Sequence, residues 1–234
     1  FPHKKIIMGT HTASLSEDFG RRVRNLIDGE EYKEIFPDTV VADDQKAAGK
    51  WSTGAGGQYY AAGVGGALAG RGADLFVIDD PHSEQDMKAN SRLAFDNAWS
   101  WFQTGPLQRL MPGGAIIVIM TRWSLLDLTG RLIDYQIKNP DTIPWEIVEL
   151  PAIVNAGTDN EKSLWPAQWS LEALKNTQNS IDPRYWNAQY MQNPTSDMSA
   201  LVSRKDWQIW ENEDPPQCDY IRSEEHTSEL QSHS

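Results

Sequence analysis

Cysteine is almost absent from this chain, since Cys218 is the single one among 234 residues. A disulfide framework and a cysteine-rich zinc site are therefore excluded within the chain. No apolar run approaches the roughly 20 residues that a membrane-spanning helix needs, and no signal-peptide pattern is recognisable. We expect a protein of the reducing cytoplasm that folds around an ordinary hydrophobic core, and the ten tryptophans support a core of that kind.

Positive charge is also scarce. The chain has 21 Lys and Arg against 33 Asp and Glu, which gives a formal net charge of -12. Such a balance argues against a free-standing basic nucleic-acid-binding domain. A motor that touches DNA through local basic patches remains compatible with it.

A third missing feature is a phosphate-binding loop of the Walker A type. Residues 49–72 hold nine of the seventeen glycines, but the motif Gly-Lys-Ser/Thr occurs nowhere in the sequence. Two interpretations of this segment stay open, a flexible connection and a ligand-contacting loop. Arg71 lies near its end and shortly before an acidic strand. We therefore consider it a candidate for contacting a phosphate, either in the same site or in a neighbouring subunit's site.

That acidic strand is the most informative feature present. Four apolar residues, 75–78, precede Asp79, Asp80 and Pro81. An unbroken apolar run is typical of a parallel strand that is buried on both faces, and ligands bind beyond the carboxyl ends of such strands. One carboxylate can then hold a hard cation while the other acts on a water, as in a Walker B strand. An ordinary strand followed by an Asp-Asp-Pro turn is the alternative.

A second apolar run, residues 115–120, ends in Thr121 and Arg122. Residues 91–103 between the two runs have a helical apolar face, so the three segments form a strand-helix-strand crossover unit. Such units have parallel strands, and the carboxyl ends of both strands lie at the same edge of the sheet. We therefore expect Asp79, Asp80, Thr121 and Arg122 to meet around one phosphate-metal ligand.

Other patterns predict the surrounding elements. A capping-box spacing, which pairs a helix-capping Ser with an acid three residues on, occurs at Ser14/Glu17 and again at Ser124/Asp127. From these and similar signals we predict a helix at 15–28, whose apolar stripe of Leu15, Phe19, Val23 and Leu26 packs on the sheet. A hairpin of strands is predicted at 51–53 and 58–62, and a helix after Ser124. An edge strand is predicted at 145–151, and short helices at 170–178 and 183–192.

The order of these segments resembles the ATPase domain of phage and prophage terminase large subunits, the motors that package DNA. The matching segments are residues 51–53 with the Gly-rich run, 70–74, 75–81, 112–123 and 189–194. The resemblance covers nearly all of residues 1–221. It implies an α/β fold of the P-loop NTPase (ASCE) type, with three layers and a mainly parallel sheet, truncated at the N-terminus.

The resemblance also implies roles for individual residues. Asp79 corresponds to the Walker B acid that positions Mg2+, and Asp80 stands where the catalytic carboxylate, usually Glu, is found. Thr121 and Arg122 correspond to the coupling motif that senses the γ-phosphate of ATP, and Arg71 is a candidate arginine finger. The implied partners are double-stranded DNA, a portal protein, a small terminase subunit and further copies in a ring. The implied location is the host cytoplasm, transiently at the procapsid portal, with no membrane involved.

The expected organisation has three parts. Residues 1–192 would be a partial ATPase domain whose Walker A loop lies upstream, and residues 193–221 a linker toward a missing RNase H-like nuclease domain. Residues 222–234 resemble the translation of a sequencing-library adapter. We therefore expect this polypeptide by itself neither to bind ATP tightly nor to cleave DNA.

Two other functions remain open from the sequence. One is another ATPase of the same broad type, such as a helicase. The other is a non-catalytic nucleic-acid or protein interaction module, in which Trp99, Trp101, Trp207 and Trp210 would be contact residues. Aromatic residues at helical or alternating spacing are more often part of a core.

Overall fold

In the computed structural model, residues 1–88 and 91–195 can be described, apart from the side chains at 44–46 and 88. The chain divides into two units between Ala200 and Leu201, so all described residues belong to the first unit. The predicted linker at 193–221 lies almost entirely outside the described residues, and the predicted adapter segment at 222–234 lies wholly outside them.

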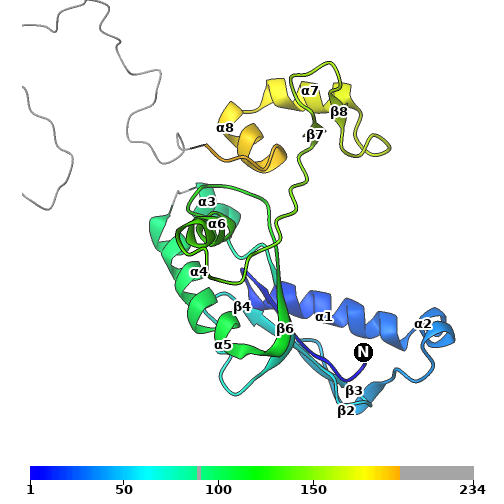
Figure 1. The fold of residues 1–234 in the computed structure, drawn as a ribbon. Helices are drawn as coiled ribbons and strands as arrows, with labels where there is room; N and C mark the ends of the chain where they lie inside the picture. Colours follow the sequence, from blue (N-terminus) through cyan, green and yellow to red (C-terminus); the bar gives the residue numbers. More distant parts are fainter. Residues whose placement is uncertain (89–90, 196–234) are drawn as a thin grey trace, which may run out of the picture. The chain divides into compact units, whose positions relative to one another are not determined.

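A six-stranded sheet organises the described chain (Figure 1). Its spatial order is β2-β3-β4-β1-β5-β6. The strands β4, β1, β5 and β6 are parallel, whereas β3 runs antiparallel to β4 and β2 antiparallel to β3. The strand bounds are β1 Lys5–Thr10, β2 Val41–Ala47, β3 Lys50–Thr53, β4 Gln58–Gly63, β5 Ala73–Asp79 and β6 Leu110–Ile119.

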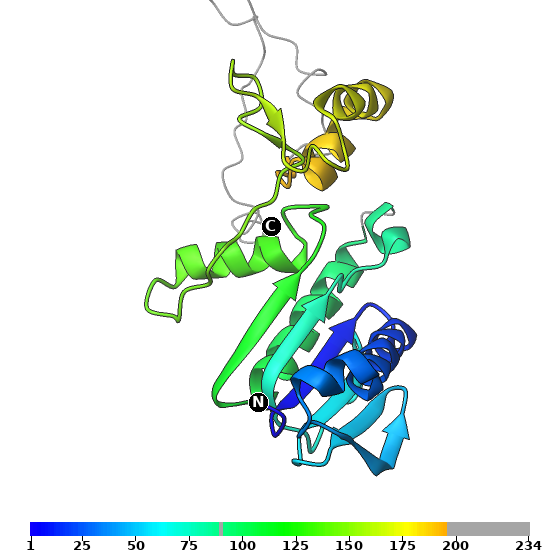
Figure 2. The same ribbon diagram turned by 90° about the vertical axis from the view of Figure 1, so that its right-hand side faces the viewer.

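Helices lie on both faces of this sheet (Figure 2). Their bounds are α1 Ala13–Asp28, α2 Glu30–Ile35, α3 Glu84–Lys88, α4 Arg92–Thr104, α5 Pro106–Arg109 and α6 Leu128–Lys138. Neighbouring residues on a strand point to opposite faces. On β1, Ile7 belongs to the core cluster that includes α4 and α6, while Met8 packs against the cluster that includes α1. The predicted α/β class with a mainly parallel sheet is therefore confirmed, and the arrangement is compatible with three layers.

The prediction that residues 75–78 are buried on both faces is only half right. Phe76 and Ile78 are fully buried under α4, but Leu75 and Val77 on the other face are only partly covered. On the neighbouring strand, Ile117 is 46% exposed. An unbroken apolar run predicts a strand covered on both faces, but among the described residues only one face of β5 and β6 is fully covered. It does not indicate which segment of the protein covers each face.

The predicted first helix is confirmed as α1, but only half of its predicted packing stripe is right, since Leu15 and Phe19 are half-buried. The residues of α1 that are buried are Ser16, Gly20 and Ile27, whereas Val23 and Leu26 are largely exposed. Close approach explains the difference, because a Cβ atom added at Gly20 would lie 2.3 Å from the ring of Tyr59 on β4. Small residues thus let the helix backbone approach the sheet, and the larger apolar residues lie beside that contact.

The predictions of single elements are confirmed where the segment packs or pairs with another described segment. The hairpin β3–β4 and the helix α4 are confirmed. The edge strand expected at 145–151 does not form, because its alternating residues have no neighbouring strand. The helix expected after Ser124 starts later, since Asp127 is its N-cap and accepts a hydrogen bond from the Gly130 N–H.

The remaining described residues form a smaller core of their own. It consists of the hairpin β7 Ile153–Val154 with β8 Lys162–Ser163, then α7 Leu171–Ser180, α8 Pro183–Tyr185 and a π-helical turn over Trp186–Tyr190. Ile153, Leu174 and Trp186 are its buried residues. This confirms the two short helices predicted for this part. No helix in the described residues is long and apolar enough to cross a membrane.

Candidate functional site

The carboxyl ends of β5 and β6 bring the predicted acidic residues and Thr121 together. The two strands are adjacent and parallel, with Asp79 in register with Ile119. The Asp80 N–H donates to the Ile119 carbonyl at 2.9 Å, and the Thr121 N–H donates to Asp80 Oδ1 at 3.0 Å. Polar residues from two separate strands therefore meet at one edge of the sheet, as the sequence predicted.

The backbone at Asp80 is strained. Its φ is +40°, a left-handed conformation that non-glycine residues rarely adopt. Neighbouring strands hold it there: besides its bonds to β6, its carbonyl accepts a hydrogen bond from the His11 N–H at the end of β1, at 3.2 Å. Conformations of this kind typically cost about 1–3 kcal/mol and are concentrated at functional sites. The Asp80 carboxylate is exposed at this turn.

Asp79 differs from its neighbour because it is partly buried. Burial raises the pKa of the Asp79 carboxyl above its usual range, and the adjacent charge of Asp80 raises it further. A cation at this edge would offset both effects, so the pair fits a hard cation such as Mg2+. In the described chain, no three His, Cys, Asp or Glu side chains are grouped to hold a metal. A cation here would need further ligands, such as the phosphate oxygens that Mg2+ shares in nucleotide sites.

Arg122 is not free to contact a ligand in this structure. Its side chain is buried, and its Nε donates to both carboxylate oxygens of Asp127, at 3.2 and 3.1 Å. Asp127 is completely buried and also accepts hydrogen bonds from the N–H groups of Trp123, Ser124 and Gly130. The guanidinium expected to sense a γ-phosphate is therefore committed to a buried ion pair that fixes the start of α6.

Sequence reasoning missed two residues around this edge, Asp127 as an ion-pair partner and His82. Burial lowers the pKa of His82, and its Nε2 accepts a hydrogen bond from the Leu128 N–H at 2.9 Å. His82 and Asp127 together satisfy the first N–H groups of α6. An Asp directly before an apolar helical segment is a signal for an N-cap and identifies Asp127, whereas no sequence signal identifies His82.

Arg71 lies at the amino end of β5, whereas the two acids lie at its carboxyl end. It precedes the first residue of β5, and the six residue steps from Ala73 to Asp79 span roughly 20 Å at about 3.3 Å per residue. Its guanidinium stacks over the Tyr60 ring, 3.6 Å from the centroid. The expectation that Arg71 could serve the site in its own chain is therefore wrong for this structure. Action in a neighbouring subunit's site stays a prediction.

The assembled edge thus has one partly buried acid, one exposed acid on strained backbone, and the end of a second strand bonded to that acid. Such a group can hold a divalent cation and orient a water molecule toward a ligand bound beyond the strands. The sequence matches no protein-family model.

Proposed function

We propose that this chain is part of a P-loop-type ATPase of the terminase class, which hydrolyses Mg-ATP to move double-stranded DNA into a procapsid. The observation that carries the proposal is the meeting of Asp79, Asp80 and Thr121 at the carboxyl edge of two adjacent parallel strands. In an ATPase of this type, the Walker B acid and the coupling residue have to face the same nucleotide.

In this proposal Asp79 holds Mg2+, and Asp80 orients the attacking water. Hydrolysis is then communicated to the segment that follows β6, because the Thr121 N–H is bonded directly to Asp80. A change in the position of the Asp80 carboxylate would be felt at Thr121 and at the adjacent Arg122–Asp127 pair, which starts α6. Arg122 acts in this scheme by transmitting movement to α6. Contact between Arg122 and the γ-phosphate would require the pair to open.

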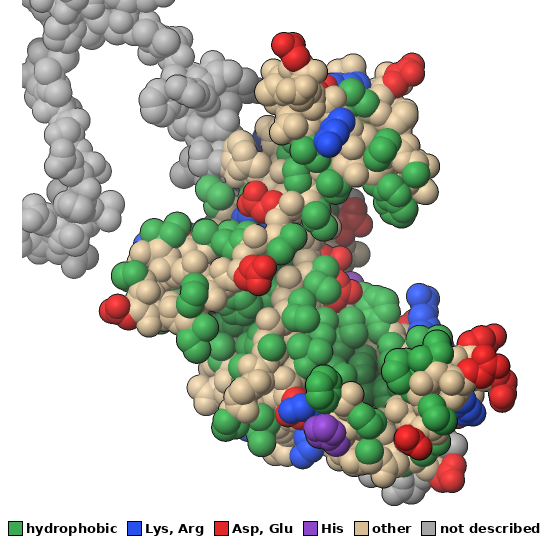
Figure 3. All heavy atoms as spheres, turned by 45° about the vertical axis from the view of Figure 1, so that its right-hand side comes forward, with side chains coloured by type: hydrophobic (Ala, Val, Ile, Leu, Met, Phe, Trp, Pro, Cys, Tyr) green, Lys and Arg blue, Asp and Glu red, His purple; other side chains and the backbone are tan. Residues whose placement is uncertain are grey.

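The uncovered parts of the sheet support the same proposal. Among the described strands β6 pairs only with β5, so the side of β6 that faces away from β5 has no neighbouring strand. Ile117 and Ile119 on its open face are about half exposed, and Figure 3 shows hydrophobic side chains gathered in a hollow of the surface. We assign this edge and face to a strand and helix that carry the phosphate-binding loop, which this sequence does not contain.

The wider assembly follows from the resemblance and is part of the proposal. A ring of copies would act at the portal protein of a procapsid in the host cytoplasm, with a small terminase subunit selecting the DNA. Cleavage of the DNA would belong to a nuclease domain outside this sequence. In such a ring Arg71 is proposed to act in trans, as an arginine finger, after leaving Tyr60.

The interaction-module alternative loses part of its basis. Trp101 is 6% exposed and packs edge-on against Phe76, and Trp99 stacks on Phe102. These two tryptophans serve the core in the described chain, while Trp207 and Trp210 lie outside the described residues. A helicase remains a second ATPase candidate, since the site itself is common to both.

The experiment uses the chain extended by the proposed Gly-Lys-Ser/Thr loop. Asp79→Asn and Asp80→Asn should each lower Mg-dependent ATP hydrolysis at least about a hundredfold, because cation binding and water activation are separate requirements. The matched control is Asp74→Asn, on the same strand but at its amino end, where the carboxylate bonds Lys4 Nζ at 2.9 Å. This control should stay within about twofold of the parent protein.

If Asp80→Asn leaves the rate of ATP hydrolysis unchanged, Asp80 does not take part in the mechanism. Equal losses from Asp74→Asn and Asp79→Asn would indicate a structural effect of either substitution and would contradict the proposal. DNA packaging into procapsids, measured with the same variants, separates a packaging motor from a helicase: a helicase would unwind duplex DNA and package none.

A further inference from the structure

His82 joins the acidic turn after β5 to the start of α6. Its Nε2 atom accepts a hydrogen bond from the Leu128 N–H at 2.9 Å, and Leu128 is the first residue of α6. An imidazole nitrogen that accepts a hydrogen bond carries no proton, so His82 is neutral and holds its proton on Nδ1. The bond is buried, so water does not compete for the Leu128 N–H.

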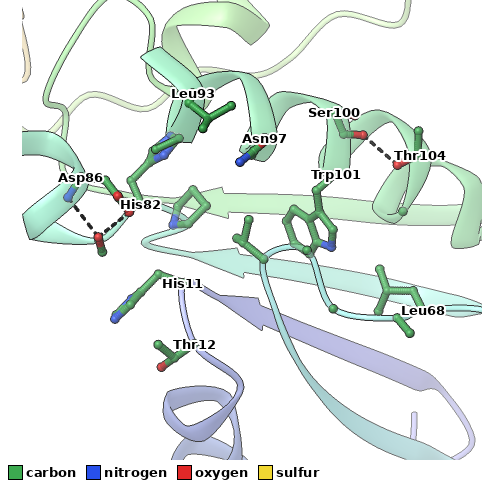
Figure 4. Close-up of a pocket in the computed structure, with 18 of the residues that line it drawn as sticks. His11, Thr12, Leu68, His82, Asp86, Leu93, Asn97, Ser100, Trp101 and Thr104 are labelled. Atoms are coloured by element: carbon green, nitrogen blue, oxygen red, sulfur yellow. Dashed lines mark hydrogen bonds between the residues drawn. The ribbon is translucent and has the colours of Figure 1, made fainter. Parts of the chain in front are cut away.

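The surroundings of the imidazole hold it in place. The residue is 7% exposed, and its ring packs edge-on against Phe95 of α4, with the two ring centroids 5.5 Å apart. Figure 4 shows the His82 ring pointing from the turn after β5 toward α4, at one end of a pocket that both elements line. Phe95 is fully buried and does not give way. The ring therefore moves when the backbone of the turn moves.

That backbone also carries the two acids. A single residue, Pro81, separates Asp80 from His82, and the proline ring fixes its φ at about −65°. Asp80 is held in the left-handed conformation by its hydrogen bonds to the neighbouring strands. After His82, the Ser83 hydroxyl accepts a hydrogen bond from the Asp86 N–H at 3.1 Å, at the start of α3. The segment thus has few free torsions, so a shift of the Asp80 backbone also shifts the imidazole.

The first turn of α6 has a second anchor, which comes from the other strand. Asp127 accepts a hydrogen bond from the Gly130 N–H at 2.8 Å and pairs with Arg122, the residue after Thr121. The two anchors satisfy different N–H groups of the same helical turn, one from the end of β5 and one from the end of β6. α6 keeps both bonds only while the two strand ends keep their relative positions.

We propose that His82 is a positioning residue: through its bond to Leu128 it sets the place of α6 relative to the two acids at the end of β5. A shift of these acids when a ligand binds is thereby passed to α6. The proposal rests on the proposed function for its consequence, since it makes α6 an element that changes position during ATP hydrolysis. By linkage, a partner that moves α6 would move the acids by the same route.

The first test measures this link by NMR in the 234-residue chain, without nucleotide. A scalar coupling between the Leu128 amide nitrogen and Nε2 of ¹⁵N-labelled His82 reports a direct N–H···N hydrogen bond. We expect the coupling in the parent protein. Asp80→Ala should weaken it, because this change releases the turn from the Thr121 N–H. The matched control, Asp74→Asn at the amino end of β5, should leave it unchanged. A parent protein without the coupling, or a coupling that Asp80→Ala leaves unchanged, would overturn the proposal.

Substitutions of His82 separate positioning from mere support of the helix. His82→Gln offers an amide oxygen as acceptor, whereas His82→Phe keeps a ring and removes the acceptor. When Asp80→Ala is added, the Leu128 amide signal should shift in the parent and in His82→Gln, and should lose most of this shift in His82→Phe. The Gly130 amide signal, which depends on Asp127, should respond alike in all three proteins.

Two outcomes of this comparison contradict the proposal. Equal Leu128 shifts in all three backgrounds would show that the acids reach α6 without His82. A Gly130 response that is lost together with the Leu128 response would show that His82 only stabilises the start of α6. If His82→Phe fails to fold, the coupling measured in the parent and in Asp80→Ala decides the matter.

The consequence for hydrolysis is measured in the chain extended by the proposed Gly-Lys-Ser/Thr loop. His82→Phe should lower kcat at least about tenfold, because small displacements of catalytic groups slow the chemical step. The KM for ATP should stay within about threefold, and His82→Gln should keep kcat within about threefold of the parent protein. An extended parent without ATPase activity would contradict the proposed function and, with it, the role of His82 in hydrolysis. An active parent whose kcat is unchanged by His82→Phe would overturn the role of His82 alone.

Discussion

The two faces of strands β5 and β6 are covered to very different extents. On one face, Phe76 and Ile78 are fully buried beneath α4 and α6. On the other face, Ile117 and Ile119 are 46% and 53% exposed. The carboxyl edge with Asp79 and Asp80 borders both faces. The covered face therefore stabilises this part of the fold, while the open face is where the proposed nucleotide site still needs a partner segment.

The largest effect is expected from the buried ion pair near the covered face. Asp127→Asn would leave the Arg122 guanidinium buried without its counter-charge, which typically costs about 3–5 kcal/mol. The free energy of unfolding, measured by denaturant titration, should fall by that amount. Asp134→Asn removes an exposed pair with Lys138 and should change it by at most about 0.5 kcal/mol. Similar small losses for both variants would show that the pair does not fix α6.

Two isoleucine substitutions, one on each face of the sheet, test whether the two faces differ in burial. Ile78→Ala on the covered face should lower the free energy of unfolding by about 2–5 kcal/mol, because it leaves a cavity under α4. Ile117→Ala on the open face should cost about 1 kcal/mol or less, because roughly half of that side chain is already in water. Equal costs at the two positions would mean that the open face is covered in solution.

On the same face of the sheet, α1 covers β4 and buries Tyr59. The pH dependence of stability can test this burial. Burial raises the pKa of Tyr59 to about 12 from its ordinary value of 10.0. The native state keeps the proton longer than the unfolded state, so the stability is fully present below pH 10 and is lost as the pH rises toward 12. The loss should be about 2–3 kcal/mol, at about 1.4 kcal/mol for each pKa unit.

Tyr59→Phe isolates this contribution from the titration of lysines. The parent protein should lose stability more steeply than the variant between pH 10 and 12, as measured by denaturant titration at each pH. At neutral pH the variant should be less stable by about 1 kcal/mol, because the Tyr59 hydroxyl donates to the Ser16 carbonyl. Parallel pH curves for the two proteins would show that the Tyr59 hydroxyl is accessible to solvent.

The smallest effects concern the strained turn at the edge. Asp80→Asn should change the free energy of unfolding by at most about 0.5 kcal/mol, because Asn tolerates the left-handed conformation and keeps an acceptor for the Thr121 N–H. Asp80→Ala should cost about 1–2 kcal/mol, because it loses that acceptor in a conformation unfavourable for alanine. An Asp80→Ala variant as stable as the parent would show that the turn relaxes without the carboxylate.

The sequence predicted the parts of the fold that depend on short-range patterns. The apolar runs before Asp79 and Thr121 identified two core strands, and the helix between them required the strands to be parallel. That sufficed to place Asp79, Asp80 and Thr121 at one edge, which the register of β5 and β6 confirms.

The failures concern which side chains face which partner. A periodic stripe predicted that Val23 and Leu26 pack on the sheet, but Gly20 allows the closest approach and turns the contact toward Ser16. The buried partner of Arg122 could not be predicted, because pairing depends on how the chain turns between β6 and α6. Arg71 is near Asp79 in sequence but lies at the other end of the strand, since β5 itself separates them.

The position of the bound cation on the sheet directly tests the proposed magnesium-nucleotide site. In a chain extended by the proposed phosphate-binding loop, Mn2+ added with a non-hydrolysable ATP analogue should broaden the amide NMR signal of Thr121 at the carboxyl edge. The signal of Lys5, whose N–H bonds Asp74 at the amino edge, should stay sharp. Broadening at Lys5 with Thr121 unaffected, or at neither residue, would contradict a magnesium-nucleotide site at Asp79 and Asp80.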